Sequence, residues 1–137
     1  MNILKNIGAV LLAVVVGNII IYSMHLLGHA IYPLPEGVDM NNSEQLAAYI
    51  PKMPLGALLM VLLAHQAGSF AGSILACGLR RKSGHVMRIG WVVGGLFLVF
   101  GVLNLFMLPH PVWFAVVDTL LYIPVALVGA RLVMPKE

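Results

Sequence analysis

Long apolar stretches without charge alternate along the chain with short segments that hold nearly all of its charged residues. Residues 6–35, 53–79 and 89–117 contain no Asp, Glu, Lys or Arg. Each of these stretches is longer than the ~20 residues that an α-helix needs to cross a bilayer. The pattern therefore predicts an integral membrane protein whose spans are helices.

Prolines and clustered basic residues divide the apolar stretches into spans. Proline ends helices because it lacks an amide donor and restricts the residue before it, so the first span ends near Pro33. Residues 89–130 hold one charged residue, Asp118, and are too long for a single crossing, so we expect the Pro109-His110-Pro111 segment to divide them. The predicted spans are about residues 3–31, 54–79, 89–108 and 112–134. We expect an all-α, four-helix membrane bundle that forms a single domain over residues 1–137, with a first span that is not cleaved as a signal peptide.

The distribution of lysine and arginine predicts the orientation of these spans. One side of the membrane would hold a single basic residue, Lys52. The other side would hold Lys5, Arg80, Arg81, Lys82, Arg88, Arg131 and Lys136. Because cytoplasmic loops are enriched in Lys and Arg, we expect both termini and the 80–88 loop to be cytoplasmic, and the 32–53 loop and the 109–111 turn to face outward. In a bacterium this corresponds to a multi-pass protein of the inner (plasma) membrane.

The outer loop carries the pattern of a short helix. Asn41 precedes Glu44 by three residues, which is typical of a helix start capped by Asn41. Leu46, Tyr49 and Ile50 then follow at helical spacing. We expect a short helix that lies on the membrane surface.

Composition excludes several classes of protein. The chain is 61% hydrophobic and only 9% charged, whereas an ordinary soluble domain carries roughly 25% charged residues. The net charge of +3 comes from residues at the predicted membrane boundaries, so we expect no nucleic-acid partner. The expected partner is the lipid bilayer, and a homo-oligomer or a partner membrane subunit remains open. The single cysteine, Cys77, excludes a disulfide within the chain.

Small residues at four-residue spacing indicate where helices pack closely. The second span carries the series Ala64, Gly68, Gly72 and Ala76. In lipid, helices associate through close approach of their backbones, which small residues permit. We therefore expect the second span to be central in the bundle and to contact two neighbours.

Every predicted span contains polar residues whose depth can be counted along the helix. At ~1.5 Å per residue, His25, Asn104 and Asp118 fall in an outer tier, and His65 falls deeper, near the midplane. Asp118 is the only acid within a span. Polar residues inside a membrane are costly and usually face the bundle interior. We expect His25, Asn104 and Asp118 to form a ligand-binding pocket that opens outward, with His65 at its base.

The histidines also suggest a metal site. His25 and His29 are spaced i, i+4 and share one helix face. Imidazoles and a carboxylate are typical zinc ligands, so a divalent metal such as zinc could be held by His25, His29, His110 and Asp118. Glu36 or Asp39 could cap the site from the outer loop. Haem is disfavoured because His65 has no second deep histidine with which to share it.

Two functions remain open at this stage. The first is an outward-facing pocket that binds a cation or a polar ligand, with transport favoured over metal-assisted chemistry. The alternative is a structural or accessory membrane subunit without catalysis, in which the intramembrane polar residues only fix helix packing. The sequence leaves open whether the chain is an enzyme.

Overall fold

A computed structural model describes residues 2–135, and these residues form helices and connecting turns without a strand. The elements are α1 (Asn2–Ile31), α2 (Ser43–Tyr49), the 3₁₀ helix η1 (Ile50–Lys52), α3 (Leu55–Leu79), α4 (Val86–Met107) and α5 (Val112–Leu132). Four of them, α1, α3, α4 and α5, are long and apolar enough to cross a membrane. The all-α class and the four candidate spans are thus confirmed, while the orientation and the bacterial inner-membrane location stay predictions.

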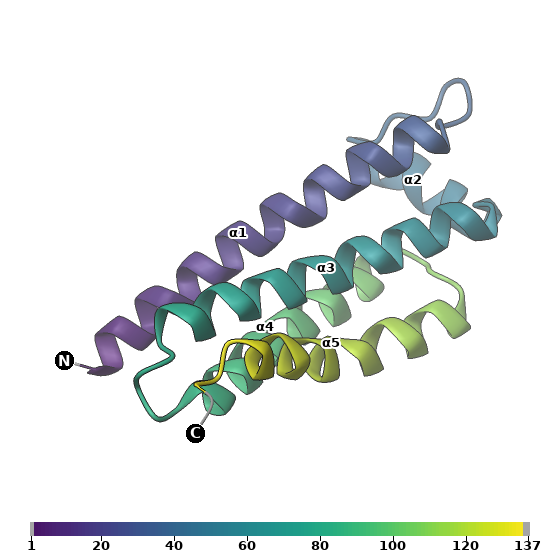
Figure 1. Cartoon of the computed structure of the whole chain (residues 1–137). Coiled ribbons are helices and arrows are strands. Elements are labelled where there is room, and N and C mark those ends of the chain that lie inside the picture. The colour runs from purple at the N-terminus through teal and green to yellow at the C-terminus, as the bar shows by residue number, and fades with distance from the viewer. Residues whose placement is uncertain (1, 136–137) are drawn as a thin grey trace.

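The four long helices lie side by side, and α2 lies near the end of the bundle where α1 ends and α3 begins (Figure 1). The first turn of α1, the α3–α4 loop and the last turn of α5 lie at the opposite end. Helix α3 contacts α1, α4 and α5. It is therefore central, as predicted, but it has three neighbours where we expected two.

Glycines allow α1 and α3 to approach each other closely. A methyl group at Gly68 would lie 2.7 Å from the carbonyl oxygen of Gly17, and one at Gly72 would lie 2.9 Å from the carbonyl oxygen of Ala13. In the same way, a methyl group at Gly94 of α4 would lie 2.9 Å from Cβ of Ala126 in α5. These separations leave no room for a larger side chain, which explains the four-residue spacing of small residues in α3.

Helices α3 and α5 are joined by buried hydrogen bonds as well as by packing. The hydroxyl of Ser69 donates to the carbonyl oxygen of Tyr122 at 3.1 Å, and that of Ser73 donates to the carbonyl oxygen of Ala126 at 2.6 Å. Both serines are fully buried. The two bonds have the same sequence separation of 53 residues, so α3 and α5 run parallel in a constant register.

The loop before α2 differs from its prediction by one residue. Asn42, and not Asn41, caps the helix, because its side-chain oxygen accepts hydrogen bonds from the amides of Glu44 and Gln45, both at 3.1 Å. The amide of Asn41 donates instead to the carboxylate of Asp39 at 2.9 Å. Because the turn at Asp39 engages the amide of Asn41, the capping role falls to Asn42, and the helix starts one residue later than predicted.

Candidate functional site

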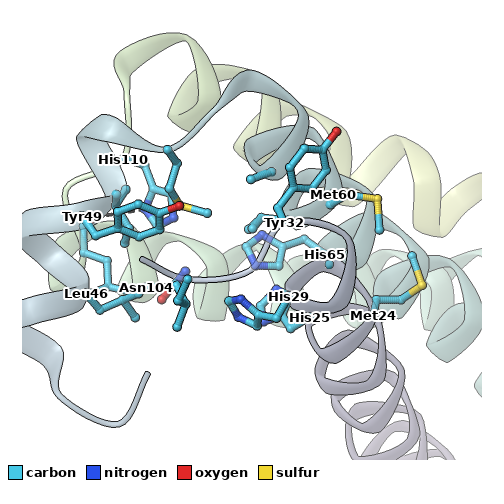
Figure 2. A pocket seen from close by; sticks show the side chains of 17 residues that line it. Met24, His25, His29, Tyr32, Leu46, Tyr49, Met60, His65, Asn104 and His110 are labelled. Atoms are coloured by element: carbon cyan, nitrogen blue, oxygen red, sulfur yellow. Dashed lines mark hydrogen bonds between the residues drawn. The ribbon is translucent and has the colours of Figure 1, made fainter. Parts of the chain in front are cut away.

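A cavity of about 250 Å³ lies at the α2 end of the bundle, between α1, α2, η1, α3 and α4. Figure 2 shows His25, His29 and His65 gathered on one side of it, with Asn104 facing them. His110, from the turn between α4 and α5, also lines the cavity. Four of the five histidines in the chain thus line one cavity. The rest of its wall is mostly apolar and holds no Lys, Arg, Asp or Glu.

Asp118 lies directly behind His65 and makes no part of the cavity wall. Its carboxylate oxygens are 3.0 and 3.2 Å from Nδ1 of His65. Gln66 Nε2 donates to the same carboxylate at 3.0 Å, and the hydroxyl of Tyr122 donates to it at 3.0 Å. Asp118 has no exposed surface. Each hydrogen bond compensates part of the cost of burying this carboxylate.

The carboxylate also sets the orientation of the imidazole of His65. With Asp118 ionised, the proton of His65 lies on Nδ1, where it is donated to the carboxylate. Nε2 is then the ring nitrogen that remains free to bind a proton or a ligand. Because His65 lines the cavity, this arrangement adds a hydrogen-bond acceptor to a wall that also holds His25, His29 and Asn104.

His25 lies next to His65 and carries an unsatisfied polar atom. The two ring centroids are 5.6 Å apart, with the planes tilted by 51°. Within residues 2–135, Nε2 of His25 is buried and has no hydrogen-bond partner. An unpaired buried polar atom costs roughly 1–3 kcal/mol. Such an atom beside a cavity is a place where a guest molecule gains a hydrogen bond.

His110 closes one side of the cavity near the α4–α5 turn. Its ring stacks on Phe114 with centroids 4.7 Å apart, and its Nδ1 donates to the carbonyl oxygen of Leu108 at 3.0 Å. Burial lowers the pKa of His110, an effect that the bond to Leu108 only partly offsets. His110 is therefore a neutral group at pH 7, and its ring and Nε2 are available to a ligand.

The predicted depths separated His65 from an outer tier of His25, Asn104 and Asp118, and the structure does not keep this separation, because His65 lies against both Asp118 and His25. His65 is ten residues into α3 from Leu55, whereas Asp118 is six residues into α5 from Val112, yet the two side chains meet. Helix α3 therefore begins about one turn further out than α5. The count from the helix ends failed because it assumed that all spans start at one level.

The remaining predicted site residues divide into two groups. His29 and Asn104 line the cavity with His25. Glu36 and Asp39 are exposed in the loop before α2 and take no part in the cavity wall, so the predicted acidic cap has no support from the lining. Among the residues that the structure describes, no group of three or more His, Cys, Asp or Glu side chains could hold a metal ion. The predicted zinc site thus has no support.

One functional candidate, Tyr122, was missed from the sequence. Tyr122 follows Asp118 by four residues, a spacing that places both on one helix face and could have revealed their hydrogen bond. Gln66 stands out in the sequence as a polar residue next to His65 in the second span, but its contact with Asp118 could not be predicted, because only the packing of α3 against α5 brings the two together.

Comparisons of the chain with protein families, curated proteins and solved structures found no match. The cavity and the hydrogen bonds around Asp118 are therefore the features that indicate a function.

Proposed function

We propose that this protein is a multi-pass membrane protein that binds a small polar ligand in the cavity beneath α2, from the outer side of the membrane. The observation that carries this proposal is the pairing of buried Asp118 with His65 at the wall of a cavity that also holds the unpaired Nε2 of His25. The outward direction follows from the distribution of Lys and Arg.

The free-energy cost of placing these polar groups in the membrane indicates that they serve ligand binding and not helix packing alone. An ionisable residue in the middle of a membrane costs about 2.5–3.5 kcal/mol on insertion scales. A hydrogen bond between membrane helices returns only about 0.6 kcal/mol on average. The unpaired Nε2 of His25 makes no hydrogen bond in the structure and therefore contributes no stabilisation. A ligand that satisfies His25 would recover part of this cost.

The half of the bundle that lies away from the cavity is tightly packed, and this packing argues against transport. Phe97 is 2% exposed, and Ala76 and Cys77 are fully buried beyond the hydrogen bonds of Ser69 and Ser73. Passage of a ligand across the membrane would require this packing among the four long helices to open. The arrangement thus favours binding from one side over the transport role that the sequence suggested.

A structural or accessory subunit is the second candidate. It is favoured by the hydrogen bonds that tie Asp118 to His65 and Gln66, because these join α5 to α3 across the core. It gives no role to the cavity or to Nε2 of His25.

Extraction of bound small molecules separates the two candidates. The protein would be purified in lipid nanodiscs, denatured, and its extract analysed by mass spectrometry. We expect a small molecule in stoichiometric amount from the wild type, and its loss from a His25→Ala, Asn104→Ala double variant. The matched control is Asn18→Ala, since Asn18 is an exposed α1 residue whose amide donates to Val14 within its own helix. Identical, empty extracts from three well-folded proteins would favour the structural subunit.

A further inference from the structure

The lining of the cavity narrows the chemical class of its ligand, and this inference rests on the proposed function. We propose that the cavity takes a neutral ring that bears carbonyl groups and an apolar tail, as in a quinone-type lipid. The polar end of the ring would accept hydrogen bonds from His25 and Asn104, and the rest would lie against the apolar wall.

The absence of charge in the wall excludes most ionic ligands. None of the residues that line the cavity is Lys, Arg, Asp or Glu. The nearest carboxylate, Asp118, is already engaged by His65, Gln66 and Tyr122. A buried ion needs a paired counter-charge or several hydrogen bonds, and without them its desolvation outweighs binding. A neutral ligand avoids this cost.

The volume of the cavity fits one ring. About 250 Å³ exceeds the roughly 150 Å³ of an engineered apolar cavity that accepts benzene. It lies below the usual ~300–1,000 Å³ of pockets for drug-sized ligands. A single six-membered ring with small substituents matches this space, and a longer tail would have to leave through the open side.

The polar groups of the wall match carbonyl oxygens. Asn104 lines the cavity, and Nε2 of His25 is buried without a hydrogen-bond partner in the part of the chain that the structure describes. The amide of Asn104 always offers donors, and a neutral imidazole can carry its proton on Nε2. Both groups can therefore donate to the oxygens of a ligand. The bond from His25 would remove the cost of leaving its Nε2 buried without a partner.

The apolar part of the wall suits the ring and the start of a tail. Met24, Met53 and Met60 line the cavity together with Leu46 and Ile50 of the outer segment. Figure 2 shows Leu46 and Tyr49 of α2 on one side of the cavity and Met60 on the other. Methionine is flexible and makes favourable contacts with aromatic rings. A sugar or another strongly hydrated ligand would leave most of its hydroxyls unpaired against such a surface.

The test uses a short-tailed benzoquinone as the probe, titrated into the full chain in nanodiscs of quinone-free lipid. Histidine side-chain NMR signals, assigned by substitution, report binding. We expect saturable shifts of the His25 and His65 signals. An alkylbenzene of equal tail length, which lacks carbonyl groups, should bind at least several-fold more weakly, and so should a fatty acid of similar size.

Variants and controls make the outcome decisive. Asn104→Leu keeps the branched shape of the side chain and removes the donors, so quinone binding should weaken about 3- to 10-fold, the loss expected for one hydrogen bond. Asn18→Leu, which changes an asparagine outside the cavity, should leave binding unchanged.

Equal affinity for the alkylbenzene would overturn the role of the carbonyl groups, and preference for the fatty acid would overturn the neutral ligand. If the quinone does not bind while a different small molecule is recovered from the purified protein, this inference fails and the proposed function stands. If neither is found, both fail.

Discussion

The carboxylate of Asp118 lies 3.0 Å from Nδ1 of His65, although 53 residues separate them along the chain. This pair connects two parts of the molecule. His65 lines the cavity at the α2 end, and Asp118 belongs to the buried hydrogen bonds that hold α5 against α3. A change at either residue should therefore affect both binding and stability, and the predictions below separate the two effects.

Replacing Asp118 by Asn tests the contribution of the carboxylate charge. The amide keeps the size of the side chain but presents an NH₂ group where Asp118 accepts hydrogen bonds from His65, Gln66 and Tyr122. At least one buried donor then loses its partner, so the protein should lose roughly 1–3 kcal/mol of stability. Thermal unfolding in detergent would measure the loss. The neighbouring Thr119→Val is the control, because Thr119 bonds only to carbonyl oxygens of its own helix, and a drop as large as that of Asp118→Asn would contradict the assignment.

Removing the hydroxyl of Tyr122 tests a single bond to Asp118. Tyr122→Phe keeps the buried ring and deletes only the donor to Oδ2. We expect a loss of about 0.5–1.5 kcal/mol, smaller than that of Asp118→Asn, because His65 and Gln66 still satisfy the carboxylate. Combining the two substitutions should give less than the sum of their effects, since the hydroxyl has no carboxylate to bind in the double variant. Additive losses would show that Tyr122 and Asp118 do not interact.

Glycine positions in α4 give a matched pair of substitutions. A methyl group at Gly101 would collide with the ring of Tyr122, whereas nothing lies within 4 Å of a methyl group at Gly95. Gly101→Ala should therefore displace Tyr122 from Asp118 and cost about 1–3 kcal/mol, the usual penalty for overpacking. Gly95→Ala should be neutral or stabilising by up to about 1 kcal/mol, because alanine favours the helix. Equal thermal stability of the two variants would contradict the packing described here.

The half-buried ring of His110 predicts a pH dependence of stability. Burial holds the pKa of His110 in the folded protein below its ordinary value of 6.5. As the pH falls below 6.5, the unfolded chain binds a proton that the folded chain does not yet bind, so stability decreases. His110→Gln should weaken this decrease when unfolding is followed from pH 7.5 down to pH 5. His85→Gln, which changes an exposed histidine in the α3–α4 loop, is the control and should keep the slope of the wild type.

The spans could be predicted from the sequence because the thickness of a bilayer fixes their length. Lys52 and the Arg80-Arg81-Lys82 cluster mark boundaries that the structure places within a few residues of the helix ends. The pairing of His65 with Asp118 could not be predicted in this way. It depends on how far α3 extends beyond α5, and hence on the long connection before α3 and the four-residue turn before α5. No periodicity in the sequence reveals how these connections set the relative heights of the two helices.

The residues around the cavity could likewise be predicted only in part. Intramembrane position was enough to select His25, His65 and Asn104, because polar residues in a membrane avoid lipid. The same criterion applies to Asn18, yet its amide donates within α1 and its side chain is exposed, so intramembrane position alone does not identify the residues of the cavity. The acidic residues of the loop before α2 were included because of their charge alone, and the fold of that loop turns Asp39 toward its own backbone neighbours.

The constant spacing of the contacts between α3 and α5 has a mechanical consequence. In α5, Ser69 and Ser73 bind carbonyl oxygens, which recur on every turn of the helix, so a slide of α5 by one turn would offer each serine an equivalent acceptor. The carboxylate of Asp118 occurs once. The contacts of this carboxylate with His65 and Gln66 therefore set the register of α5 against α3, and His65 also lines the cavity in which a ligand would bind.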